Sequence, residues 1–147
     1  MFNKILLPID GSESAEHAMT YALEQASTFS AELIIITVVP PTSALLFGDD
    51  DFPTINIEDY EKAMEESHKE VLTLAVERVK KSNPELKTKT VLDHGHVGIS
   101  IVNIAKKEDV DLIVMGDRGL SGVSEFLLGS TSRYVVEHCI KPIMIVK

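Results

Sequence analysis

The chain has 147 residues, enough for one domain with a hydrophobic core, and its 44% of hydrophobic residues argues against a disordered protein. A formal net charge of −9 argues against nucleic acid or an anionic membrane as the main partner, because both attract basic surfaces. The one cysteine, Cys139, cannot form an intrachain disulfide, and no signal-type pattern follows Met1. We therefore expect a cytoplasmic protein.

Strand-like and helix-like patterns alternate along the whole chain. In chain order we expect a strand at 4–9, a helix at 15–29, a strand at 33–39, a helix at 60–79, an edge-type strand at 86–92, a short helix around 101–105, a strand at 110–115, a helix at 130–139 and a strand at 142–146. Continuous apolar strands separated by helices are typical of a parallel sheet covered on both faces. The sequence therefore predicts an α/β fold, a doubly wound five-stranded parallel sheet with helices on both faces.

The carboxyl ends of the expected strands are the natural place for a ligand. In doubly wound sheets, ligands bind beyond these ends, where the strand order reverses. Asp10, Val38 and Gly116 each fall at, or just after, the end of an expected strand. A long loop at residues 40–57 follows the second strand, and loops of this length are usually functional or mobile. Its acidic run is most simply a solvated surface.

The segment after the strand at 110–115 carries the strongest functional signal. Gly116-Asp117-Arg118-Gly119 is followed, after nine residues, by Gly129-Ser130-Thr131-Ser132 at the start of the last expected helix. Glycines let backbone amides approach a ligand closely, and a helix N-terminus favours an anion. We therefore interpret the segment as a phosphate cradle, the simpler alternative being a flexible loop with a helix cap. For Arg118 two roles stay open, a phosphate contact and an exposed loop arginine.

These motifs, in this order, resemble the universal stress protein family. The resemblance rests on the glycine segment, on residues 4–12 (Lys-Ile-Leu-Leu-Pro-Ile-Asp-Gly-Ser), on residues 111–116 and on the ending at 141–146. It covers nearly the whole chain, and the glycine spacing is similar to the signature of the ATP-binding branch. The resemblance implies one nucleotide-binding domain over residues 1–147, of the adenine-nucleotide alpha hydrolase-like kind, that binds ATP.

The resemblance also implies a role for each site residue. Asp10 would lie beside the ribose, where a carboxylate suits two hydroxyls, although its simpler role is to stabilise a turn. Pro8 and Ile9 would flank the base, and the backbone of Val38 would read the adenine edge, although core packing is its simpler role. The ribose and phosphates would be lined by Met115, Gly116, Gly119, Gly129, Ser130, Thr131 and Ser132.

Two other patterns raise the alternative of a metal site. His94 and His96 lie two residues apart, so an extended segment would place both on one face. No further histidine or cysteine is near them in sequence, and we favour exposed or hydrogen-bonded histidines. Asp49-Asp50-Asp51 offers carboxylates, although such a run is usually just hydrated. We expect no metal ligands from the chain, and Mg²⁺ or Mn²⁺ held by the phosphates of ATP.

Three functions are consistent with these patterns. The leading hypothesis is an ATP-binding regulatory protein, acting through its oligomer or a partner, in a stress response or in solute transport. We expect little ATPase activity and no catalytic residues, because neither a Walker lysine nor a positioned general base is present. The alternatives are a weak ATPase that phosphorylates itself on a hydroxyl such as Ser130, and a nucleotide-independent adaptor that docks on a protein such as a membrane transporter. The apolar strand from Pro142 to Val146 predicts a homodimer, or a tetramer, because family members commonly pair through it.

Overall fold

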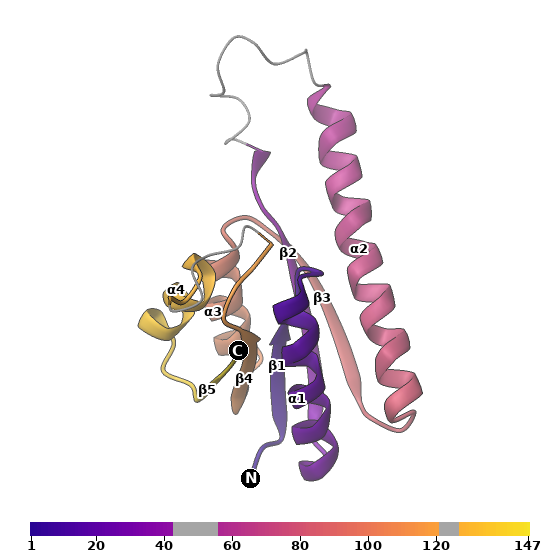
Figure 1. Cartoon of the computed structure of the whole chain (residues 1–147), viewed down its shortest axis with the longest axis vertical. Coiled ribbons are helices and arrows are strands. Elements are labelled where there is room, and N and C mark those ends of the chain that lie inside the picture. The colour runs from indigo at the N-terminus through magenta and orange to yellow at the C-terminus, as the bar shows by residue number, and fades with distance from the viewer. Residues whose placement is uncertain (43–55, 121–126) are drawn as a thin grey trace.

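The computed structural model describes residues 1–42, 56–120 and 127–147 (Figure 1). Its elements in chain order are β1 (Lys4–Pro8), α1 (Glu13–Phe29), β2 (Glu32–Val39), α2 (Ile57–Ser82), β3 (Thr88–His94), α3 (Val97–Lys107), β4 (Leu112–Gly116), α4 (Ser130–His138) and β5 (Ile143–Val146). All pairings between neighbouring strands are parallel, in the order β3-β2-β1-β4-β5. The predicted α/β fold with a five-stranded parallel sheet is confirmed.

The sheet is covered on both faces, as Figure 1 shows, with α1 and α2 on one side and α3 and α4 on the other. The two sides take alternate residues of the same strand. In β2, Leu33 and Ile35 pack with the α1 and α2 side, whereas Ile34 and Ile36 pack with the α3 and α4 side. All four side chains are buried, which explains why the strand reads as an unbroken apolar run rather than an alternating one.

The order of the strands fixes where a ligand can bind. From β1 the chain builds outwards through β2 to β3, and it then crosses back to β4 on the other side of β1. The reversal therefore lies between β1 and β4, and their carboxyl ends form the switch point at which such sheets bind ligands. The predicted edge strand at 86–92 is β3, which begins two residues later because Leu86 belongs to the turn after α2, where its N–H bonds to the Asn83 carbonyl.

A side chain caps the start of α1, α2 and α3, but not that of α4. Ser12 caps α1, since its Oγ accepts from the Ala15 N–H at 3.1 Å. Asn56 caps α2 in the same way. The exception is α4, where Gly129 occupies the cap position and provides no side-chain hydrogen bond. The first turn of α4 therefore keeps unpaired amides at the switch point.

Some predictions fall on residues that the structure does not describe. They concern Asp49-Asp50-Asp51 and most of the loop at 40–57, together with the segment 121–126. Of the helices in the described parts of the chain, none combines the length and apolar character needed to cross a membrane.

Candidate functional site

A cleft opens at the switch point, between the ends of β1 and β4 and the starts of α1, α3 and α4. It is lined by Pro8, Ile9, Asp10, Ala15, Val97, Ile101, Met115, Gly116, Arg118, Gly119, Gly129, Ser130, Thr131 and Ser132. The cavity measures about 100 Å³, below the roughly 300–1,000 Å³ of pockets that bury a drug-sized ligand. A ligand as large as a nucleotide must therefore extend through the mouth of the cleft or displace part of its wall.

The cleft brings together every residue that the sequence assigned to the site, apart from Val38. Val38 lies in β2 with its side chain 5% exposed and packed on the α3 and α4 side of the sheet. Its predicted role is a backbone contact, which the position of the side chain does not test. Sequence reasoning missed Ala15, Val97 and Ile101, whose spacing reads as ordinary helix core.

Gly116, the last residue of β4, and Gly119, three residues later, have different surroundings. A Cβ added at Gly116 would collide with Ser14 Oγ and would lie 2.8 Å from the Ser14 carbonyl carbon. Gly116 is therefore a glycine because α1 begins directly against it. Among the described residues, a Cβ at Gly119 would meet one atom within 4 Å, Asp10 Oδ2 at 3.1 Å. Gly119 thus borders the cleft beside the Asp10 carboxylate, where a side chain would occupy ligand space.

Asp117 joins three parts of the site, a role that the sequence did not reveal. Its carboxylate accepts a hydrogen bond from Ser14 Oγ at 2.9 Å, which attaches the loop to the start of α1. Its carbonyl accepts from the Gly129 N–H at 2.7 Å and from Ser132 Oγ at 2.9 Å, which attaches the loop to the start of α4. Asp117 is only 3% exposed. It acts as a positioning residue, and its most distant partner, Ser14, lies 103 residues away in sequence.

The start of α4 offers backbone donors to the cleft. The N–H groups in the first turn of a helix have no intrahelical acceptor, and the helix dipole places partial positive charge there. Ser130 is exposed and Thr131 half-buried, so both hydroxyls are also accessible from the mouth of the cleft. The Ser132 hydroxyl is different, because it donates to the Asp117 and Gly129 carbonyls and is buried. Ser132 can therefore serve a ligand through its amide rather than as a hydroxyl donor.

Asp10 is held by backbone amides from two directions. Its Oδ1 accepts from the Ser12 N–H at 2.9 Å, which confirms the turn role expected from the sequence. Its Oδ2 accepts from the Leu120 N–H at 3.2 Å, so the loop after Gly119 is attached to the same carboxylate. Each carboxylate oxygen has a second lone pair. Asp10 is therefore oriented and still able to accept from a hydroxyl of a ligand.

The α3 wall of the cleft is positioned by contacts with α4. His96 caps α3, its Nδ1 accepting from the Ile99 N–H at 3.2 Å, so the hydrogen-bonded interpretation of this histidine is confirmed. A Cβ added at Gly98 would lie 2.6 Å from Tyr134 Cδ1, which shows how closely α3 and α4 approach. No group of three or more His, Cys, Asp or Glu side chains converges within the described ranges.

The chain is similar in sequence and in fold to known proteins. The sequence matches the model of the Universal stress protein family over residues 1–147. Universal stress protein YxiE of Bacillus subtilis is 33% identical over 150 residues, and the alignment covers 100% of both chains. The solved structure of MJ0577 from Methanocaldococcus jannaschii is 30% identical, with a TM-score of 0.78 over 100% of this chain and 96% of that one. A universal stress protein solved in complex with cAMP is 26% identical, with a TM-score of 0.73 over 99% and 97% of the two chains.

Proposed function

The chain belongs to the universal stress protein family, and we propose that it is an ATP-binding member whose nucleotide occupies the cleft between β1 and β4. The observation that carries the proposal is the start of α4, which has no side-chain cap and whose first amides have no acceptor within the helix, at a cleft lined by Gly119 and Gly129. The relative solved with cAMP supports an adenine nucleotide as the class of ligand.

The chemistry of the cleft favours one orientation of the nucleotide. The phosphates take the amides of residues 130–132, because these are the donors with no partner inside the helix. The ribose lies beside Asp10, whose carboxylate retains acceptor capacity. The base takes the apolar wall formed by Pro8, Ile9, Val97, Ile101 and Met115.

The described part of the cleft contains one carboxylate, that of Asp10, and no cluster of metal ligands. A divalent cation such as Mg²⁺ or Mn²⁺ would therefore depend mainly on phosphate oxygens, as is usual for Mg²⁺ in nucleotide sites. When bound, the cation would offset the charge of the phosphates. The protein itself contributes the backbone amides that bind the phosphates and the oriented carboxylate of Asp10.

We propose that nucleotide binding is read out by the surface around the cleft. Leu120 and Leu127 are 73% and 53% exposed, and both lie in the segment between Gly119 and Gly129. Leu120 is attached to Asp10 through its amide, so a ribose that engages Asp10 would alter the position of this leucine. Such a change in apolar surface would shift the population of an interaction-competent oligomer or partner complex in the cytoplasm.

The open edge of β5 supports the homodimer that the sequence predicts through the strand from Pro142 to Val146. The Pro142 and Val146 carbonyls accept from the Ile113 and Asp117 N–H groups of the β4 side. Because alternate residues of a strand direct their backbone groups to opposite sides, Ile143 and Ile145 present unpaired N–H and C=O groups at the edge. A second copy of the chain would pair there.

Calorimetric titration of nucleotide-free protein with ATP and Mg²⁺ tests the proposal. We expect saturable binding to the wild type and at least a tenfold loss of affinity in Gly119→Val, because the added side chain occupies the space beside Asp10. A thermal melt of the variant establishes that it is folded. Unchanged ATP affinity in folded Gly119→Val would refute the site.

Phosphate release during the same titration separates the binding protein from an enzyme. Fewer than one turnover per protein is expected for a switch. Multiple turnovers that disappear in folded Asp10→Ala would instead support the ATPase alternative. No binding at millimolar ATP would leave the nucleotide-independent adaptor, docking on a transporter or another protein, as the better account.

A further inference from the structure

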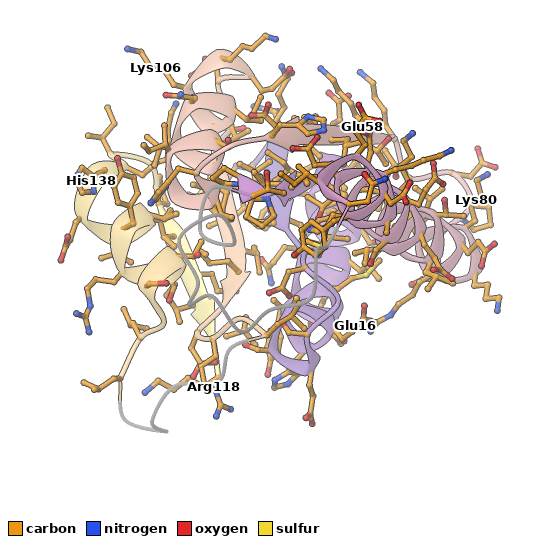
Figure 2. The ribbon with its side chains drawn as sticks, turned by 90° about the horizontal axis from the view of Figure 1, so that it is seen from above. Glu16, Glu58, Lys80, Lys106, Arg118 and His138 are labelled. Atoms are coloured by element: carbon orange, nitrogen blue, oxygen red, sulfur yellow. The ribbon has the colours of Figure 1, made fainter. Side chains whose placement is uncertain are left out.

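The described lining of the cleft contains a single basic side chain, that of Arg118. The other ionisable side chain there is Asp10, which carries the opposite charge. Figure 2 shows Arg118 near the rim of the molecule, well separated from Lys80 and Lys106, which belong to the far ends of α2 and α3. The cleft therefore has one local cation to set against the several negative charges of a polyphosphate.

The backbone of Arg118 lies against the start of α4. The Arg118 Cα is 3.4 Å from the position that a Cβ on Gly129 would take, and Gly129 directly precedes Ser130. The Arg118 N–H lies 3.4 Å from Ser14 Oγ, within the same contacts that fix Asp117. Arg118 also lines the cleft, and an arginine side chain is long enough to extend well beyond this root.

The guanidinium is free to change partners. Its nearest carboxylate is that of the adjacent Asp117, with 3.5 Å between Arg118 Nε and Asp117 Oδ1. That carboxylate already has a shorter hydrogen bond, from Ser14 Oγ at 2.9 Å. The Arg118 side chain is 39% exposed and the Asp117 side chain 5%, but their 3.5 Å separation is longer than that of a charge-assisted hydrogen bond, and the carboxylate keeps its hydrogen bond from Ser14 when the guanidinium moves. Moving the guanidinium from Asp117 to a phosphate therefore costs the folded protein little.

We propose that Arg118 is the specificity-determining residue that makes the site distinguish nucleotides by their number of phosphates. This inference rests on the proposed nucleotide function. The α4 amides seat the phosphate that lies deepest, and they serve AMP as well as ATP. Phosphates further along the chain project towards the rim, where the planar guanidinium binds their oxygens through paired N–H donors.

Titration with a series of nucleotides shows whether Arg118 recognises the number of phosphates or whether its substitution only disturbs the loop. Adenosine, AMP, ADP and ATP, each with excess Mg²⁺, are titrated by calorimetry into the wild type, Arg118→Gln and Arg118→Lys. Arg133→Gln is the matched control, because Arg133 is an exposed arginine in the first turn of α4 and is not among the residues that line the cleft. Thermal melts of all variants establish that each is folded.

In Arg118→Gln we expect ATP affinity to fall about 10- to 100-fold, as for the loss of a hydrogen-bonded charge, with ADP affected less. Adenosine affinity stays within about twofold. Arg118→Lys recovers part of the ATP affinity because it restores the charge without the planar pair of donors. Arg133→Gln matches the wild type with every ligand.

Three results would overturn the inference while leaving the nucleotide function intact. They are unchanged ATP affinity in Arg118→Gln, an equal loss for adenosine and ATP, or an equal loss in Arg133→Gln. Failure of the wild type to bind any member of the series would overturn the proposed function itself, and this inference with it.

Discussion

Replacing Gly116 with alanine tests the claim that this glycine is required by packing and not by a ligand. The new Cβ would collide with Ser14 Oγ and lie 2.8 Å and 2.9 Å from the Ser14 carbonyl carbon and oxygen. The hydroxyl can rotate away, but it then loses its hydrogen bond to the Asp117 carboxylate. The backbone atoms can move only if the start of α1 shifts away from β4.

The expected cost follows from these two contributions. Forcing an extra methyl into a packed site costs about 1–3 kcal/mol, and a hydrogen bond to a charged group contributes about 1.5–3 kcal/mol. We therefore expect Gly116→Ala to lower the free energy of unfolding by roughly 3–5 kcal/mol. For a chain of this size, a loss at the lower end corresponds to a fall in Tm of about 10 °C.

Urea denaturation and thermal melting measure this loss, with Gly119→Ala as the control. Gly119→Ala should cost less than about 1 kcal/mol, since in the described part of the chain its Cβ meets only the tip of the Asp10 side chain. Ser14→Ala removes the hydroxyl but not the backbone contacts, so Gly116→Ala should remain destabilising in that background. A loss below about 1 kcal/mol in Gly116→Ala, or full rescue by Ser14→Ala, would refute the packing argument.

Two further predictions concern the opposite end of the sheet and its open edge. The Asn3 and Lys4 N–H groups donate to Asp111 Oδ2 at 2.7 Å and 3.0 Å and lower the pKa of this carboxyl below its ordinary value of 3.8. A carboxyl whose pKa is lowered in the folded state stabilises the fold above pH 3.8, and this stabilisation is lost as the pH falls through the folded-state pKa. The Tm of the wild type should therefore exceed that of Asp111→Asn by less as the solution is acidified. A Tm difference that does not change with pH would contradict this. Ile145→Pro removes an N–H from the free edge of β5 without breaking the pairing with β4. Ile145→Pro should be a monomer by light scattering. Ile145→Ala keeps the edge N–H although it loses most of the side chain, and it should stay dimeric. The same oligomeric state in both variants would argue against pairing through β5.

The fold was predictable because a strand that is buried on both faces has a continuous run of apolar residues, which is easily recognised in the sequence. The strand run at 33–39 is apolar at nearly every position, and β2 covers that run with one added residue. The edge strand β3 was placed two residues early, because none of its residues is fully buried and its sequence pattern is weaker. The third helix was expected around 101–105 but spans Val97–Lys107, since its cap is His96, a residue type that sequence rules do not favour at that position.

The site was predictable where it depends on short motifs and unpredictable where it depends on packing. The glycine segment and Asp10 identified most of the cleft, because strand ends in a parallel sheet meet at one edge. Val97 and Ile101 line the cleft from α3, a helix whose start packs closely on Tyr134 at Gly98. The role of Asp117 was hidden, because it works through its carbonyl and through a contact with Ser14.

The central claim is that this cleft binds an adenine nucleotide with its phosphates on the start of α4. Backbone amide NMR of ¹⁵N-labelled protein, titrated with ATP and Mg²⁺, tests it most directly. We predict saturable shifts of one affinity for the amides of Gly119, Ser130 and Thr131, with Lys80 and Lys106 unaffected. Saturable shifts confined to other parts of the chain, or none at millimolar ATP, would contradict the account.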